Sequence, residues 1–363
     1  MPCKRASIAL AALLFLAACT ASGTGPADAP AEAASRAAAK VTLMTFNVEN
    51  LFDTVNDPGK DDKAFLPLAA KQSPQHRAAC GAIEVPAWRA ECLDLDWNEA
   101  VLERKLAAIG AVIRAAGAPD VIAFQEVEHA ALLDRLRDDE LDGLGYGAAI
   151  LIEGSDLRGI DVAFLSRLPV TGEPRLHPLA FPGHAEREGD TRGILEATFR
   201  LPDGSLLTGF AVHFPAPYHP TAMREEAYAA LSDLLAALPP ERTAFAAGDF
   251  NTTSTEAAAT GILETHARPD WHIAHEEAGC EECRGTYYYA RDDNWSFLDM
   301  ILVRPGRGGD ATWGLRPDSA HVANPLDAQR TRAGTPLSFD PATGAGVSDH
   351  WPLVVTLETT QKQ

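Results

Sequence analysis

The chain has 363 residues, of which 46% are hydrophobic and 23% charged, and this balance excludes a wholly disordered chain and a polytopic membrane protein. The length fits two average domains, or one large layered α/β domain with short appendages. Asp and Glu number 51 against 31 Lys and Arg, a formal net charge of -20, which has the wrong sign for binding nucleic acid by general electrostatic attraction. A phosphate-bearing substrate would therefore have to be held locally, through a metal ion.

The N-terminus has the pattern of an export signal. Lys4 and Arg5 supply the positive start, and Ala6–Ala18 is an apolar run too short to cross a membrane as an ordinary helix. The segment Leu16-Ala-Ala-Cys19 resembles the lipobox of bacterial lipoproteins, in which the cysteine is lipid-modified and becomes the mature N-terminus. The alternative is a secretory signal cleaved after a small residue, with Cys19 a bystander.

We therefore predict a lipoprotein signal peptide over residues 1–18 and a flexible Ala/Pro/Gly-rich tether over 19–40. A lipid on Cys19 would anchor the protein at the bacterial cell envelope, in the periplasm or on the cell surface. The remainder is expected to form a single domain over 41–358 with a C-terminal tail at 359–363, and to be a monomer.

Short apolar runs typical of strands alternate with helices after the tether. Val41–Asn47 is predicted to be a buried strand, and Val121–Phe124 another. Between them, a helix capped by Asp96 and Glu99 is indicated by apolar residues at helical spacing: Val101, Leu102, Leu106, Ile109, Val112 and Ile113.

Later segments add more strands than helices. Further strands are expected at Tyr146–Ile152, Asp161–Ser166, Ile194–Phe199, Leu206–His213, Thr243–Ala247, Leu298–Val303 and Leu353–Leu357. Helices are expected at Glu128–Arg137 and Met223–Leu238, and long insertions at 56–97 and 267–293. This order favours two packed sheets with helices outside over one doubly wound parallel sheet.

Four cysteines lie beyond Cys19, and an even number in an exported chain favours disulfides. Three pairings are possible, and we favour Cys80 with Cys92. The motif Cys280-Glu-Glu-Cys283 is interpreted as a structural disulfide. Half of a zinc site and a redox dithiol are the alternatives, but the chain has neither a second CxxC motif nor a βαβ redox context to support them.

Acids, amides and histidines gather at six strand ends. A lone acid there is usually a turn residue or a helix cap, and a lone histidine is more often structural than catalytic. Together they indicate a site for phosphate-ester hydrolysis, which needs a hard cation, a group that deprotonates water and a means of stabilising the leaving oxygen. The residues are Asn47, Gln125 and Glu126, His213, Asp249 and Asn251, Asp299, and Ser348, Asp349 and His350.

The ligand chemistry favours Mg²⁺ or Mn²⁺, because carboxylate and amide oxygens suit hard cations and no thiolate lies near the set; zinc is less favoured. Asp249 and Asn251 are two residues apart, so in extended backbone both leave one face while Phe250 faces the core. Asp349 and His350 are neighbours and would approach the metal and the phosphate from different sides.

At these residues the chain resembles the endonuclease/exonuclease/phosphatase superfamily, which includes deoxyribonuclease I, apurinic endonucleases, sphingomyelinases and inositol-polyphosphate phosphatases. The family's motifs occur in order over nearly the whole mature domain. They are Thr45-Phe-Asn-Val-Glu-Asn-Leu-Phe-Asp53, Phe124-Gln-Glu126, Gly248-Asp-Phe-Asn251, Leu298-Asp299 and Ser348-Asp-His350. The resemblance implies an α/β fold, a four-layer αββα sandwich of two mainly antiparallel or mixed sheets flanked by helices.

The resemblance also implies roles for the site residues. Glu126 would bind the metal with support from Asn47 and Asp349. Asp249 and Asn251 would orient the water and the phosphate. Asp299 would orient His350, which contacts the phosphate or acts as general base, and the choice of base between His350 and Asp249 stays open. His213 looks like the second histidine of deoxyribonuclease-like and sphingomyelinase-like members, a general acid for the leaving oxygen.

Other positions are less specific. Arg158 resembles a phosphate-contacting residue of such enzymes, with a surface salt bridge as the alternative, while Asp161 reads more readily as a turn acid. Glu49 stands where many DNA-repair members have a basic residue, which argues against abasic-site repair; it is either an extra ligand or a paired acid. The aromatic run Tyr287–Tyr289 either stacks a base or packs under the insertion, and we favour packing.

The leading hypothesis is a lipid-anchored, metal-dependent phosphodiesterase, most consistent with a nuclease acting on extracellular or periplasmic DNA or RNA. A phosphatase or a sphingomyelinase-like phospholipid diesterase is the second reading. A catalytically silent lipoprotein that binds envelope components is the third, and the full set of polar strand ends argues against it.

Overall fold

The computed structural model describes residues 38–280, 282–307 and 311–361, which belong to a compact unit that begins at Ala38. The predicted signal peptide, Cys19 and the tether up to residue 37 lie outside the described residues. Among the helices in the described ranges, none combines the length and the hydropathy needed to span a bilayer.

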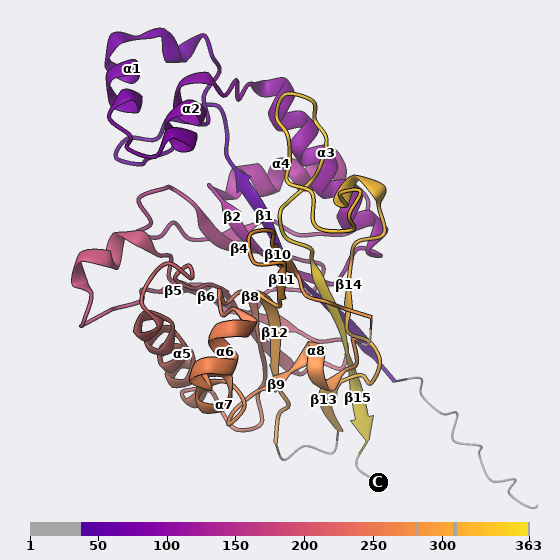
Figure 1. Ribbon diagram of the computed structural model, residues 1–363. Helices are drawn as coiled ribbons and strands as arrows, with labels where there is room; N and C mark the ends of the chain where they lie inside the picture. Colours follow the sequence, from indigo (N-terminus) through magenta and orange to yellow (C-terminus); the bar gives the residue numbers. More distant parts are fainter. Residues whose placement is uncertain (1–37, 281, 308–310, 362–363) are drawn as a thin grey trace, which may run out of the picture. The chain divides into compact units, whose positions relative to one another are not determined.

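Two mixed sheets form the centre of the unit (Figure 1). The seven-stranded sheet has the order β13-β15-β1-β2-β4-β3, with β14 also paired to β15, and its one parallel pair is β1 with β2. Its strands are β1 (Lys40–Leu51), β2 (Val121–Val127), β3 (Ile150–Leu151), β4 (Asp161–Ser166), β13 (Ala311–Leu315), β14 (His321–Val322) and β15 (Leu353–Gln361).

The six-stranded sheet has the order β5-β6-β7-β8-β12-β9, and its one parallel pair is β7 with β8. Its strands are β5 (Arg175–His177), β6 (Ile194–Arg200), β7 (Leu206–His213), β8 (Thr243–Asp249), β9 (His272–Ile273) and β12 (Asp299–Arg304). A separate hairpin pairs β10 (Tyr287–Tyr289) with β11 (Asn294–Ser296).

Strand alternation explains the layers. In β1, Val41 and Leu43 belong to the core between the sheets, whereas Met44 and Phe46 belong to the core beneath α3 and α4. The opposite face of the six-stranded sheet carries α5–α7 on a third core. The predicted four-layer αββα sandwich is therefore confirmed.

The helices complete the outer layers and the insertions. They are α1 (Pro74–Gly81), α2 (Pro86–Asp94), α3 (Glu99–Ala115), α4 (Ala130–Glu140), α5 (Thr221–Ala236), α6 (Ser254–Thr260), α7 (Ile262–His266) and α8 (Ala274–Glu277), with 3₁₀ turns η1 (Ala70–Gln72), η2 (Ala185–Asp190) and η3 (Asp327–Gln329). The predicted insertion over 56–97 contains η1, α1 and α2. Its Cys80–Cys92 disulfide joins α1 to α2, and Cys280 pairs with Cys283, so both favoured pairings are present.

Three sequence expectations need correction. The predicted cap of α3 is wrong: Asn98 is the N-cap, with its side chain accepting from Val101 N at 3.2 Å, while Asp96 accepts from Leu68 N. The strand expected over 146–152 is only β3, a two-residue edge strand. In contrast, β15 extends to Gln361, into the predicted tail, because β13 pairs with it there.

Candidate active site

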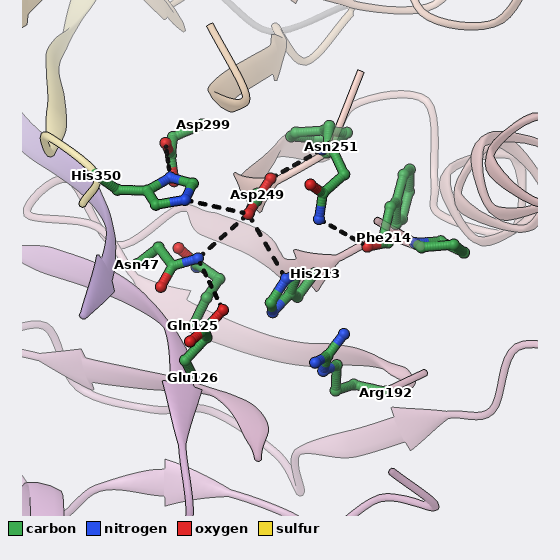
Figure 2. A network of polar contacts seen from close by, with 12 residues as sticks. Asn47, Gln125, Glu126, Arg192, His213, Phe214, Asp249, Asn251, Asp299 and His350 are labelled. Carbon is green, nitrogen blue, oxygen red and sulfur yellow. Dashed lines mark hydrogen bonds and ion pairs between the residues drawn. The ribbon is translucent and has the colours of Figure 1, made fainter. Parts of the chain in front are cut away.

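The polar residues converge at one end of the two sheets. In the pairing register of the six-stranded sheet, His213 lies opposite Asp249, and Asp249 lies opposite Asp299. Asn47 and Glu126 come from β1 and β2 of the facing sheet, and His350 from the turn before β15 (Figure 2). Residues that are far apart in the sequence thus surround the Asp249 carboxylate.

Irregular backbone at the ends of β1 and β2 directs Asn47 and Glu126 into the site. The pairing register shifts after Asn47 and again around Glu126, and Glu126 has the rare positive φ of 64°. Gln125 is buried, and its Oε1 accepts from Thr45 Oγ1 at 3.1 Å. Asn47 Nδ2 then reaches Glu126 Oε1 at 3.4 Å and Asp249 Oδ2 at 3.2 Å.

The segment after β8 holds Asp249 in place. A Cβ on Gly248 would meet the Val212 carbonyl oxygen at 1.9 Å, so only glycine allows β8 to approach β7 this closely. Asn251 has φ of 50° and donates its N–H to Asp249 Oδ1 at 2.8 Å, and its Nδ2 donates to Phe214 O at 3.0 Å. Phe250 is buried in the helix-facing core, as its position predicted.

His350 and Asp299 form a buried pair, with Nδ1 of the imidazole 2.7 Å from Asp299 Oδ2. Burial alone would lower the pKa of His350, but the neighbouring carboxylates, Asp299 first, raise that pKa well above its usual value. The imidazole is therefore positively charged near neutral pH, and its Nε2 lies 3.9 Å from Asp249 Oδ2.

His213 differs from His350 in charge. Burial, with smaller contributions from Arg192, Arg158 and His350, holds the pKa of His213 well below its usual value. Its Nε2 lies 3.6 Å from Asp249 Oδ2, and its buried Nδ1 has no partner among the described residues. His213 is therefore a neutral imidazole at the edge of the site.

A cavity of about 300 Å³ lies beside these residues, and arginines form part of its lining. Arg158 Nη2 donates to Asn50 Oδ1 at 2.6 Å and lies 4.0 Å from Glu126 Oε2. Arg192, which the sequence prediction missed, is buried against Asp156 at 2.9 Å and also lines the cavity. The prediction concentrated on residues that follow strands, whereas Arg192 precedes β6, an antiparallel strand that starts at the same edge.

The structure also shows the contacts of the other candidates from the sequence. Asp161 Oδ1 accepts from Gly154 N at 2.9 Å, away from the cavity lining, which is the turn role expected for it. Glu49 Oε2 accepts from Phe339 N at 2.9 Å, and Glu49 is not among the residues that line the cavity. Tyr287 and Tyr289 pack edge to face at 4.7 Å while both line the cavity.

The donor set fits a hard cation. Burial raises the pKa of Asp249 and of Asp349 to about 7, and Glu126 adds to both shifts through like-charge repulsion. Glu126, Asp249 and Asp349 line the same cavity, and Asn47 Nδ2 lies between the Glu126 and Asp249 carboxylates, at 3.4 and 3.2 Å. Such a concentration of oxygen donors is what Mg²⁺ and related ions prefer.

Comparisons with known proteins agree with this geometry. The Endonuclease/Exonuclease/phosphatase family model matches residues 44–350, and no curated protein matches the chain. The fold is shared with an endonuclease/exonuclease/phosphatase from Bacteroides vulgatus (18% identity, 88% of this chain and 99% of that chain, TM-score 0.53). D. rerio TDP2 complexed with single strand DNA product is similar (17% identity, 88% of this chain and 98% of that chain, TM-score 0.53). A functionally unknown protein from Enterococcus faecalis V583 is similar as well (16% identity, 89% of this chain and 100% of that chain, TM-score 0.54). The chain belongs to the endonuclease/exonuclease/phosphatase family of divalent-metal-dependent phosphate-ester hydrolases.

Proposed function

We propose that this protein is a phosphodiesterase of the bacterial cell envelope that cleaves DNA or RNA. One observation carries the proposal, namely the surroundings of the Asp249 carboxylate. Asn47 donates to Asp249 and also contacts Glu126. The imidazoles of His350 and His213 both face the same carboxylate. Asp249 can therefore accept a proton from water. It lies between Glu126, on the side proposed to bind the cation, and the two histidines, on the side that donates hydrogen bonds.

Roles follow from charge and position. Glu126, Asn47 and Asp349 would hold Mg²⁺ or Mn²⁺, and that ion would supply charge neutralisation for the phosphate. Asp249 takes the proton of the attacking water, because the His350 imidazolium has no free lone pair for it. Asp299 keeps His350 charged and oriented toward the phosphate, and Asn251 fixes Asp249 through its backbone N–H.

His213 has a narrower role than the general acid that the family resemblance implies. A neutral imidazole donates a hydrogen bond through its single N–H, and loss of that proton altogether would leave an unstable anion. We assign His213 to hydrogen bonding with the leaving oxygen or a phosphate oxygen, where its position beside Asp249 and the arginine-lined wall favours an anionic group.

The cavity wall supports a nucleic-acid substrate. Arg158 is half exposed beside Glu126 and available to a phosphate. At the mouth, the Tyr218 ring is 81% exposed and lies 4.2 Å from the His219 ring, a platform on which a base can stack. The arginines that line the cavity would let a chain of net charge -20 bind a phosphate locally.

A phospholipid diesterase is the second candidate, because an adjoining groove contains apolar side chains. This groove has a volume of about 470 Å³, includes Phe65, Ile83 and Trp88, and shares Arg158 and Tyr218 with the cavity. An acyl chain or a base fits such a surface. Activity on the two substrate classes therefore has to be compared directly.

The decisive experiment measures hydrolysis by the full chain of single-stranded DNA, RNA, a generic diester, a monoester and sphingomyelin, with Mg²⁺, Mn²⁺ or chelator. We expect metal-dependent cleavage of nucleic acid that is lost in Glu126→Gln and His350→Ala. Hydrolysis of sphingomyelin without nucleic-acid cleavage selects the lipid enzyme. Equal activity in both variants rejects the site, and no turnover of any substrate favours a binding lipoprotein.

Envelope location is a separate part of the proposal. It rests on the signal and lipobox patterns and on the two disulfides, which are typical of exported proteins. Incorporation of labelled fatty acid into the wild type and its loss in Cys19→Ser test lipid anchoring. Label in both proteins, or in neither, contradicts a lipid on Cys19, and sedimentation of the delipidated protein tests the expected monomer.

A further inference from the structure

A second group of carboxylates lies outside the cavity, beyond the ends of β1 and β2. Asp57, Asp62 and Glu128 each offer an oxygen, and these atoms lie within 4.8 Å of one another; we call them the second carboxylate cluster. Asp53 and His129 form an overlapping group with Glu128. Asp62 is 2% exposed and Glu128 4% exposed, so this is not an ordinary solvated acidic surface.

The hydrogen bonds in the cluster leave an acceptor unused. Asp62 Oδ2 accepts from Asp57 N at 2.7 Å, and Glu128 Oε2 accepts from Asp53 N at 2.6 Å. The other oxygen of Asp62, Oδ1, is buried and has no hydrogen-bond partner among the described residues. A buried carboxylate oxygen without a partner is costly, which indicates that a ligand such as a cation is missing here.

No lysine or arginine among the residues that the structure describes supplies that charge. In the described ranges, no lysine or arginine lies within ion-pair distance of the cluster; His129 Nε2, at 3.7 Å from Glu128 Oε2, is the nearest basic atom. The lysines of the same loop pair elsewhere: Lys60 binds the carbonyl of Asp156 and the carboxylate of Glu153, and Lys63 pairs with Asp61.

We propose that the second carboxylate cluster binds a calcium ion, separate from the catalytic cation. Three carboxylates from a loop and a strand end match the preference of Ca²⁺ for several oxygens in flexible geometry, whereas Mg²⁺ demands strict octahedral geometry and retains its waters. The ion joins the loop after β1 to the segment after β2. It therefore fixes the ends of the two strands that carry Asn47 and Glu126.

The test measures calcium binding and thermal unfolding of the full-length protein after metal removal. We expect wild type to bind Ca²⁺ with a dissociation constant between about 10⁻⁶ and 10⁻³ M, and its melting temperature to rise as the ion is added. Asp62→Asn should weaken binding at least about tenfold, because one charged ligand is lost. Asp61→Asn is the matched control, since its exposed carboxylate pairs with Lys63 outside the cluster.

A second readout separates a calcium site from a merely structural residue. Without metal, Asp62→Asn should melt no lower than wild type, because the substitution keeps an acceptor for Asp57 N and removes like-charge repulsion. Glu126→Gln should retain calcium binding, which distinguishes this ion from the catalytic one. Wild-type affinity in Asp62→Asn, or no binding by wild type at about 5 mM Ca²⁺, overturns the proposal. If Asp62→Asn does not fold, Asp57→Asn provides the same comparison.

Discussion

Two groups of buried carboxylates lie near the ends of β1 and β2, and they differ in how their charge is balanced. Around Asp249, the His350 imidazolium, the Asn47 amide and the N–H of Asn251 all supply positive or donating groups. The second carboxylate cluster has backbone donors but no paired lysine or arginine among the described residues. The first group is thus balanced by side chains of the protein, whereas the second lacks a cationic side chain of its own.

Removing one carboxylate from each group gives the largest contrast. Glu126→Gln should lower turnover at least about 10³-fold, because a cation ligand is lost. Asp57→Asn should change turnover less than about threefold at saturating Mg²⁺ and Ca²⁺, since its carboxylate lies outside the cavity. Steady-state rates on the preferred diester check both values. A comparable loss in the two variants would show that the groups act as one site.

Removing the partner of the imidazolium has the next largest effect. Asp299→Asn should lower kcat by about 10² to 10³-fold, because the carboxylate that charges and orients His350 is lost. In the metal-free protein, the pKa of His350 should fall toward its usual value, as followed by NMR. An unchanged pKa would mean that other carboxylates suffice to charge the ring.

Arg158 offers a smaller effect that concerns substrate binding. Arg158→Ala should raise KM about tenfold with little change in kcat, because a phosphate contact outside the reacting centre is removed. Arg175→Ala, at an exposed position in β5, is the control for lost positive charge. Equal KM changes in the two variants would point to general electrostatics rather than to a specific contact.

Asp161 tests a third way to bury a carboxylate, by protonation. Burial raises the pKa of Asp161 to about 7, so between roughly pH 4 and 7 the folded state holds a proton that the unfolded state has lost. Stability from this group is complete below pH 4 and is lost as the pH rises to 7. Asp161→Asn, which keeps the acceptor for Gly154 N, should remove this dependence.

The measurement is the free energy of unfolding by urea at pH 5 and pH 8. The free energy of unfolding of the variant should be closer to that of wild type at pH 5. At pH 8 it should be larger than that of wild type by on the order of a few kcal/mol. Asp142→Asn, at an exposed carboxylate, should show no such change. A wild-type advantage that grows with pH would mean that Asp161 is ionised and paired in the folded state.

Local pattern predicted much of the fold because the strands follow period-two burial. The predicted bounds of Asp161–Ser166 and Leu206–His213 match β4 and β7. The edge strand β3 was predicted too long, since hydropathy does not show how many partners a strand has. Asn98 was missed as the cap of α3 because Asp96 has a similar side chain but is bound to Leu68 N instead.

The chain's order of motifs, by itself, determined the family, the layered fold and the residues that meet around Asp249, because each of these residues lies at a recognisable strand end. Tertiary structure alone decided the charge of His350 and His213, the entry of Arg192 into the cavity and the grouping of Asp57 and Asp62 with Glu128. The physical reason is that protonation and ion binding depend on burial and on neighbours brought together by packing, and neither quantity is written in local spacing.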